Sequence, residues 1–115
     1  MKKKKIIWSD DAADDLCDII SYIRHASGKK IASDISARIL GHVEKIVIFP
    51  ESGRLIPELS SMGITDIREI IEAPWRICYR IVDDEIRVLS VIDGRRNVEE
   101  LLYKKLIQGG LGHPL

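Results

Sequence analysis

The chain has 115 residues, of which 45% are hydrophobic and 31% are charged, and 18 basic residues balance 18 acidic ones. This length allows one domain with a single core. Because the net charge is zero, electrostatic attraction of the whole protein to a polyanion such as a nucleic acid is excluded. Since no apolar run approaches the roughly 18 residues that cross a bilayer, we expect a cytoplasmic protein with no membrane partner.

The first half of the chain predicts a short strand followed by two helices. Residues 3–8 form a lysine-rich and then apolar run that fits a strand, and Ser9-Asp10 can cap a helix that ends near Ala26. A second helical pattern begins near Lys29 and, because about three residues separate the two, they should form an antiparallel hairpin. The predicted buried stripes are Ala13, Leu16, Cys17, Ile20 and Ile23, and then Ile31, Ile35, Ile39, Val43 and Ile46.

The second half predicts a long connection and then three strands. Residues 49–65 are rich in Pro, Gly and Ser, and within them Gly53 is expected at a positive φ and Arg54 at the carbonyl end of the second helix. From Asp66 the apolar residues alternate, which indicates strands over 67–72, 75–82 and 86–93 joined as an antiparallel meander. Asn97 can cap a last helical segment.

The predicted order is therefore β-α-α-β-β-β with a short C-terminal helix. A helical hairpin packed on a small antiparallel sheet is an α+β architecture. We expect a single domain over residues 1–108 and a flexible tail over residues 109–115, where three glycines and a proline follow one another closely.

Short motifs follow one another along residues 5–97. They are Trp8-Ser9 with Ala12, Asp15-Leu16 and Tyr22-Ile23; Phe49-Pro50-Glu51-Ser52-Gly53-Arg54; Asp66-Ile67-Arg68-Glu69; Trp75-Arg76-Ile77-Cys78-Tyr79-Arg80; and Val91-Ile92-Asp93-Gly94-Arg95-Arg96. In this ordered combination the chain resembles the RelE/ParE superfamily of type II toxin–antitoxin toxins, and most of all its ParE branch, whose members are also called plasmid-stabilisation toxins. The resemblance implies a compact toxin that a cognate antitoxin holds inactive in a hetero-oligomeric complex.

The ParE branch implies action by protein contact, through binding of DNA gyrase, and asks for no catalytic dyad and no cofactor. Arg95-Arg96 is the best local candidate for such a contact, because two adjacent guanidiniums that leave a strand cannot both point inward. Glu99 and Glu100 are also within reach of them, so docking and a salt-bridged rim are both open. The candidate residues for target or antitoxin binding are Arg54, Arg76, Arg80, Arg95, Arg96 and Trp75.

The resemblance also allows a ribosome-dependent mRNA endoribonuclease that works without a metal. In-line attack by a 2′-hydroxyl needs a base, an acid and cations on the phosphorane. Arg76 matches the strand arginine of RelE-like RNases, Arg68 lies on the neighbouring strand, and Tyr103 is the nearest acid or base. Against this, no lysine lies between Lys45 and Lys104. Carboxylates that can instead pair with the two arginines are Glu58, Glu69 and Glu72.

A third alternative is a degenerate member of the family that only binds its antitoxin and, together with it, autoregulates transcription.

Neither the histidines nor the cysteines have the spacing of metal ligands, so we expect no metal site. His25 ends the first helix, His42 is expected near the exposed side of the second, and His113 lies in the predicted tail. Cys17 and Cys78 lie in apolar patterns, which predicts two buried free thiols.

Overall fold

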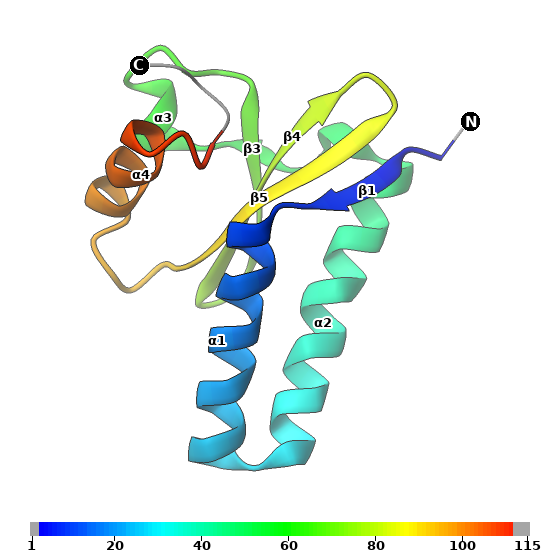
Figure 1. Cartoon of the computed structure of the whole chain (residues 1–115). Helices are drawn as coiled ribbons and strands as arrows, with labels where there is room; N and C mark the ends of the chain where they lie inside the picture. The colour runs from blue at the N-terminus through cyan, green and yellow to red at the C-terminus, as the bar shows by residue number, and fades with distance from the viewer. Residues whose placement is uncertain (1–2, 112–115) are drawn as a thin grey trace.

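A computed structural model describes residues 3–111, in which a mixed sheet of five strands separates two groups of helices (Figure 1). The strand order is β1-β5-β4-β3-β2; β1 pairs with β5 in parallel and every other pair is antiparallel. The predicted α+β class and the meander are confirmed, whereas the parallel place of β1 was not predicted. The strands are β1 Lys5–Trp8, β2 Arg54–Leu55, β3 Ile67–Glu72, β4 Trp75–Val82 and β5 Glu85–Asp93.

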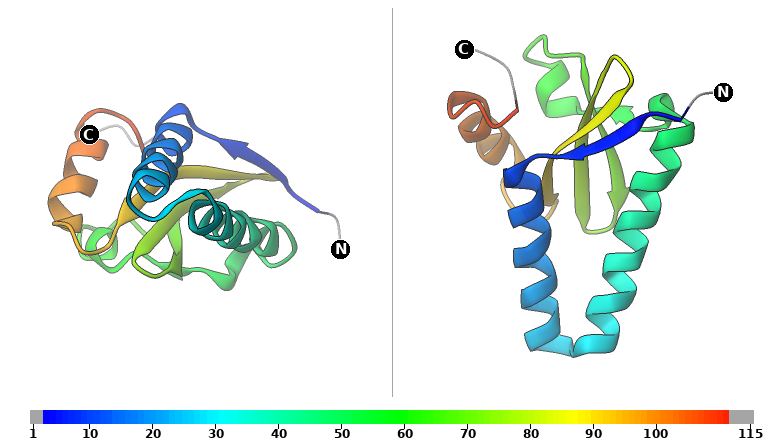
Figure 2. Two further views of the ribbon diagram at one scale, coloured as in Figure 1. Left: turned by 90° about the horizontal axis from the view of Figure 1, so that it is seen from below. Right: turned by 45° about the vertical axis from the view of Figure 1, so that its right-hand side comes forward.

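The helical hairpin follows from its caps. Ser9 Oγ accepts a hydrogen bond from the Ala12 amide at 3.0 Å, which starts α1 (Asp10–Ser27). Gly28 has a φ of 94° and joins α1 directly to α2 (Lys29–Ile48), so the turn is shorter than predicted. Figure 2 shows the hairpin extending away from the sheet to a tip where the two helices meet.

The buried stripe of each helix is narrower than predicted. Because the far part of the hairpin extends beyond the sheet, the helices there can cover only each other. Ile31, near the tip, is exposed for this reason although it was predicted to be buried. Ala13 and Cys17 are exposed as well, because they lie beside the buried side of α1, which contains Ala12 and Ile23; the prediction of a buried Cys17 thiol is wrong. The buried residues of the hairpin are Ala12, Ile23, Ala32, Ile35, Ile39, Val43 and Ile46.

Two shorter helices, α3 (Pro57–Ser60) and α4 (Val98–Ile107), cover the opposite face of the sheet. Asn97 Oδ1 accepts from the Glu100 amide at 3.2 Å, so the predicted cap of α4 is confirmed. Cys78 lies in this second core, where burial raises the pKa of its thiol to about 12. The core here comprises Ile56, Leu59, Ile67, Cys78, Leu89, Ile92, Val98, Leu102, Leu106 and Leu111.

The C-terminal end packs further along the chain than predicted. Leu111 is fully buried in the second core, and its carbonyl accepts a hydrogen bond from Arg80 Nη2. The first three residues of the stretch predicted as a flexible tail, 109–111, thus end in a side chain that packs on the sheet. Residues 112–115, with His113, lie outside the described residues. No helix within residues 3–111 is both long and apolar enough to span a membrane.

The connection over residues 49–65 is structured by tertiary contacts. It contains a 3-10 turn at Pro50–Ser52, strand β2 and helix α3. Gly53 has a φ of −74°, so the predicted positive φ is wrong. A Cβ on Gly53 would lie 2.7 Å from the Glu69 carbonyl oxygen and closer still to Tyr79 Oη, which explains the glycine by close approach. Tyr79 Oη accepts from the Gly53 amide at 3.0 Å and donates to the Pro50 carbonyl at 2.6 Å.

Candidate functional site

Arg76 on β4 is enclosed by carboxylates. Its Nε donates to Glu69 Oε1 at 2.6 Å, and its Nη1 and Nη2 donate to Glu58 Oε2 and Oε1 at 2.8 and 2.7 Å. Only 11% of the Arg76 side chain is exposed, and Glu69 is fully buried. Arg76 therefore has the bidentate carboxylate pairing that a guanidinium fork prefers, with no edge left for a phosphate.

A second arginine completes this group, which we call the Arg76 cluster: Arg54, Glu58, Glu69 and Arg76. Arg54 on β2 donates from Nε to Glu69 Oε2 at 2.7 Å, because the sheet register places the two residues directly opposite each other. The prediction that Arg54 caps the carbonyl end of the second helix is therefore wrong. The hydrogen bond to Glu58 raises the pKa of Arg76, and the same bond lowers the pKa of Glu58. The cluster thus holds two cations and two anions and is electrically balanced.

The residues proposed for RNA cleavage do not meet. Arg68 is opposite Tyr79 in the register, and Arg76 lies on the same side as Cys78, so the two arginines face opposite sides of the sheet. Arg68 Nη1 donates to the Gly53 carbonyl at 2.7 Å and not to a nearby carboxylate. Tyr103 on α4 is 53% exposed and lines a hollow in which no arginine takes part.

Arg80 also has internal partners. Its Nε lies 3.2 Å from Asp66 Oδ2, and its Nη2 reaches the Leu111 carbonyl. Only 13% of its side chain is exposed. Arg80 therefore fixes Leu111 to the sheet, and it offers little surface to a partner.

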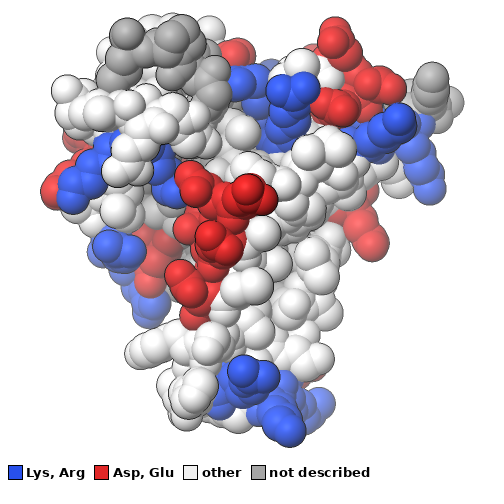
Figure 3. All heavy atoms as spheres, viewed as in Figure 1, with Lys and Arg blue, Asp and Glu red and all other residues white. Residues whose placement is uncertain are grey.

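Three of the predicted contact residues do come together, at a groove of about 460 Å³ beside α1. Asp18, Ile19, Tyr22 and Ile23 form its α1 wall, and Pro74, Trp75, Asp93, Arg95 and Arg96 line the rest. A neighbouring hollow shares Asp18, Ile19, Asp93 and Arg96 with it and continues to Leu101 and Lys105 on α4. We call this continuous depression the α1 groove. Figure 3 shows the acidic side chains over α1 with basic side chains beside them.

One partly buried contact fixes the position of the α1 wall. Asp15 Oδ2 accepts from Ser90 Oγ at 2.9 Å and from the Val91 amide at 3.0 Å. The same oxygen lies 3.6 Å from Lys105 Nζ on α4. Asp15 thereby joins α1 to β5 and α4, the elements between which the groove lies.

The two adjacent arginines of the groove differ from each other. Arg95 donates from Nε and Nη2 to the two oxygens of Asp93 at 3.0 and 2.8 Å, and this pairing lowers the pKa of Asp93 and raises that of Arg95. Arg96 forms no ion pair with any of residues 3–111, and only its charge at longer range contributes to the lowered pKa of Asp93. The alternative of a salt-bridged rim therefore applies to Arg95, which pairs with Asp93 and not with Glu99 or Glu100, because Asp93 is only two residues away; Glu100 pairs with Lys104.

Tyr22 is the groove residue that sequence reasoning missed. It is 73% exposed although it is aromatic, and it faces the same depression as Trp75, which is half-buried. Its position off the apolar stripe of α1 and its place in a motif of the superfamily were the available signals, and neither indicated that it would share a groove with Trp75, which comes from a distant strand.

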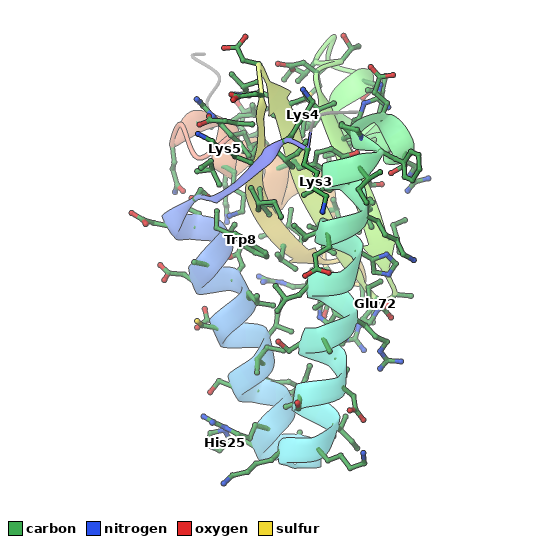
Figure 4. The ribbon with its side chains drawn as sticks, turned by 90° about the vertical axis from the view of Figure 1, so that its right-hand side faces the viewer. Lys3, Lys4, Lys5, Trp8, His25 and Glu72 are labelled. Carbon is green, nitrogen blue, oxygen red and sulfur yellow. The ribbon has the colours of Figure 1, made fainter. Side chains whose placement is uncertain are left out.

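No group of three His, Cys, Asp or Glu side chains within residues 3–111 could hold a metal ion. His25 Nδ1 lies 2.8 Å from the Ser21 carbonyl at the end of α1. His42 is half-buried and not at the exposed side as expected, because its Nε2 lies 3.0 Å from Glu72 Oε1 on β3. Figure 4 shows Glu72 beside α2 and His25 near the far end of the hairpin.

The model of the ParE toxin family, described as the ParE toxin of the type II toxin–antitoxin system parDE, matches residues 6–98. This chain belongs to the ParE toxin family. Toxin ParE3 of Caulobacter vibrioides is 27% identical to it over 101 residues, which cover 88% of this chain and 97% of that protein. The predicted superfamily, and the ParE family within it, are therefore confirmed.

Solved structures of related systems share the fold of this ParE-family chain. The chromosomal ParDE system of P. aeruginosa matches with a TM-score of 0.65 at 21% identity, over 79% of this chain and 96% of that one. The RelBE2 toxin–antitoxin complex of Mycobacterium tuberculosis matches with a TM-score of 0.52 at 18% identity, over 80% and 99%. At these identities the likeness concerns the fold alone.

Proposed function

We propose that this ParE-family toxin acts by protein contact on DNA gyrase and that a cognate antitoxin neutralises it within a hetero-oligomeric complex. The observation that carries the proposal is the balance of charge in the Arg76 cluster, where Glu58 and Glu69 occupy the guanidinium of Arg76. An arginine that must stabilise a phosphorane needs donors aimed at the phosphate, and those of Arg76 are engaged.

Other features favour contact over RNA cleavage. Arg68 and Arg76 face opposite sides of the sheet, and Tyr103 lies apart from both, so these three cannot act on one phosphate. The zero net charge also suits a protein target better than a ribosome, whose RNA attracts basic surfaces.

Among the candidate contact residues, we assign the contact to Trp75, Arg95 and Arg96, which line the α1 groove. Arg76 and Arg80 have side chains exposed by only 11% and 13%, so we assign them a structural role. Arg54 is more exposed, at 57%, yet its Nε is committed to the buried Glu69.

The test uses purified toxin with purified DNA gyrase and relaxed plasmid. We expect the toxin to inhibit supercoiling and to increase the amount of linear, gyrase-cleaved DNA. In cells, induction should cause filamentation and DNA damage while the mRNA pool stays intact, and co-expression of the antitoxin should restore growth. Early arrest of translation with cut mRNA would instead establish the endoribonuclease, and an absent growth defect would establish a degenerate member.

A further inference from the structure

The α1 groove has walls of opposite charge. On α1, exposed Asp18 lines the groove, and Asp11 and Asp14, which are also exposed but lie outside the lining, continue an acidic row along the same side of the helix at steps of three and four. Across the groove lie Arg95 and Arg96, of which Arg96 has no ion-pair partner among residues 3–111. A ligand that lies in the groove must therefore present basic groups on one flank and an acidic group on the other.

Aromatic side chains lie between these walls. Tyr22 is 73% exposed, and Trp75, which lines the same depression, is half-buried. Tryptophan, tyrosine and arginine are the residues most often responsible for binding energy at protein interfaces, because they bury a large surface at small entropic cost. The groove combines all three types within one depression.

The charges of the groove argue against a nucleic acid as its ligand. Arg95 and Arg96 would attract a phosphate backbone, but Asp18 and Asp93 line the same depression and cancel them. The acidic row on α1 adjoins this wall and would repel a polyanion further. A protein segment, which can carry both signs of charge, is the better complement.

The dimensions favour a helix. The α1 wall from Asp15 to Ile23 covers eight residue steps, or about 12 Å along a helix axis. This length matches about two turns of a second helix lying against α1, whose side chains at i, i+3 and i+4 would face one flank of the groove.

We propose that the α1 groove binds an amphipathic helix of the toxin's protein target, with a basic side chain toward Asp18, a carboxylate toward Arg96 and a large apolar side chain toward Tyr22 and Trp75. This proposal rests on the proposed function, action by protein contact. The short length and exposed charges of the groove suit a reversible contact with an enzyme, whereas a lasting complex with an antitoxin requires a larger and more apolar interface.

Two variants test the groove, and a third is their control. Arg96→Glu reverses the one unpaired cation of the groove, and Tyr22→Ala removes its exposed aromatic ring. Arg38→Glu makes the same charge change at an exposed site on α2 that lines no part of the groove. Circular dichroism and thermal unfolding of all three should match the wild type, because each side chain is exposed.

The measurements are the concentration of purified toxin that halves gyrase supercoiling and the growth of cells after induction. We expect Arg96→Glu and Tyr22→Ala to raise that concentration by about 30-fold each, as for central interface residues, and to restore growth. Arg38→Glu should stay within about twofold of the wild type.

Several results would overturn the proposal. The first is inhibition by both groove variants within twofold of the wild type. The second is a groove variant that stays toxic but is no longer neutralised by the antitoxin, since the groove would then belong to the antitoxin. The third is binding of a single-stranded oligonucleotide that Arg96→Glu abolishes. If wild-type toxin arrests growth without inhibiting gyrase, the assignment of gyrase fails, while the growth assay still decides whether the groove contacts the target.

Discussion

Arg76 and Arg96 carry the same guanidinium in opposite surroundings. Arg76 is 11% exposed and makes three hydrogen bonds to two carboxylates, whereas Arg96 is exposed and has no ion-pair partner within residues 3–111. Both belong to the motifs by which the chain resembles its superfamily. The difference shows that a motif arginine reveals its role only through its neighbours.

The contrast follows from the position of each residue. Arg76 is in the middle of the sheet, where β3 supplies Glu69 and the adjoining α3 supplies Glu58. Arg96 comes after the last strand, where the chain turns away toward α4. A buried cation must be paired because its desolvation is costly. An exposed cation stays hydrated, so it can remain unpaired until a partner protein binds.

The largest expected effect is on stability. Arg76→Ala should lower the free energy of unfolding by about 3–5 kcal/mol, because fully buried Glu69 would keep only the exposed Arg54. Urea unfolding followed by circular dichroism measures this. A loss below about 1 kcal/mol would mean that the Arg76 cluster is not a buried ion-pair network.

Gly53 tests the packing around the same cluster. Gly53→Ala should cost about 1–3 kcal/mol, because the new Cβ would meet the Glu69 carbonyl and the Tyr79 hydroxyl and the backbone must shift. Gly41→Ala is the matched control: Gly41 is helical and has open space around it, so this change should stabilise α2 by up to about 1 kcal/mol. Equal effects from the two substitutions would refute the close-approach explanation.

Acid should weaken the pair between Glu58 and Arg76. Arg76 lowers the pKa of Glu58 from its ordinary 4.5, so the pair contributes fully above that value, and its contribution is lost as the pH falls through the folded-state pKa. Between about pH 6 and about pH 3, the wild type should lose about 1 kcal/mol more unfolding free energy than Glu58→Gln. Parallel pH profiles for the two proteins would contradict this assignment.

The smallest expected effect completes the comparison. Arg96→Ala should change the free energy of unfolding by no more than about 0.5 kcal/mol, because the side chain is exposed and has no ion-pair partner in the described part of the chain. The same urea titration serves here. A loss of 2 kcal/mol or more would place Arg96 in the stabilising framework and remove its contrast with Arg76.

Local patterns predicted the hairpin, the meander and the capped last helix, because each has a repeat or a cap that the sequence displays. They missed β2 and α3, whose few residues gain structure from Glu69 and the second core rather than from propensity. They also missed the parallel pairing of β1 with β5, which joins distant parts of the chain. Pairing of Arg76 with Glu58 and Glu69 was foreseen as an alternative, but the choice needed the register of the sheet.

The role of Gly53 could not be predicted for a similar reason. Its sequence context favours a turn with a positive φ, and only the approach of Tyr79 from another strand explains the residue. The α1 groove combines Tyr22 with Trp75 and Arg96, and no local pattern indicates that these residues meet.

The bond between Asp15 and Ser90 spans 75 positions in the sequence. During synthesis α1 leaves the ribosome early and β5 leaves it late. Asp15 can therefore form this hydrogen bond only after most of the chain has been made. Contacts between residues this far apart in the sequence slow folding, because the entropy of closing the intervening chain is lost before the contacts stabilise the structure. A nascent chain whose β5 is still inside the ribosome therefore lacks one wall of the groove. We expect the surface that we assign to the target to form late in folding.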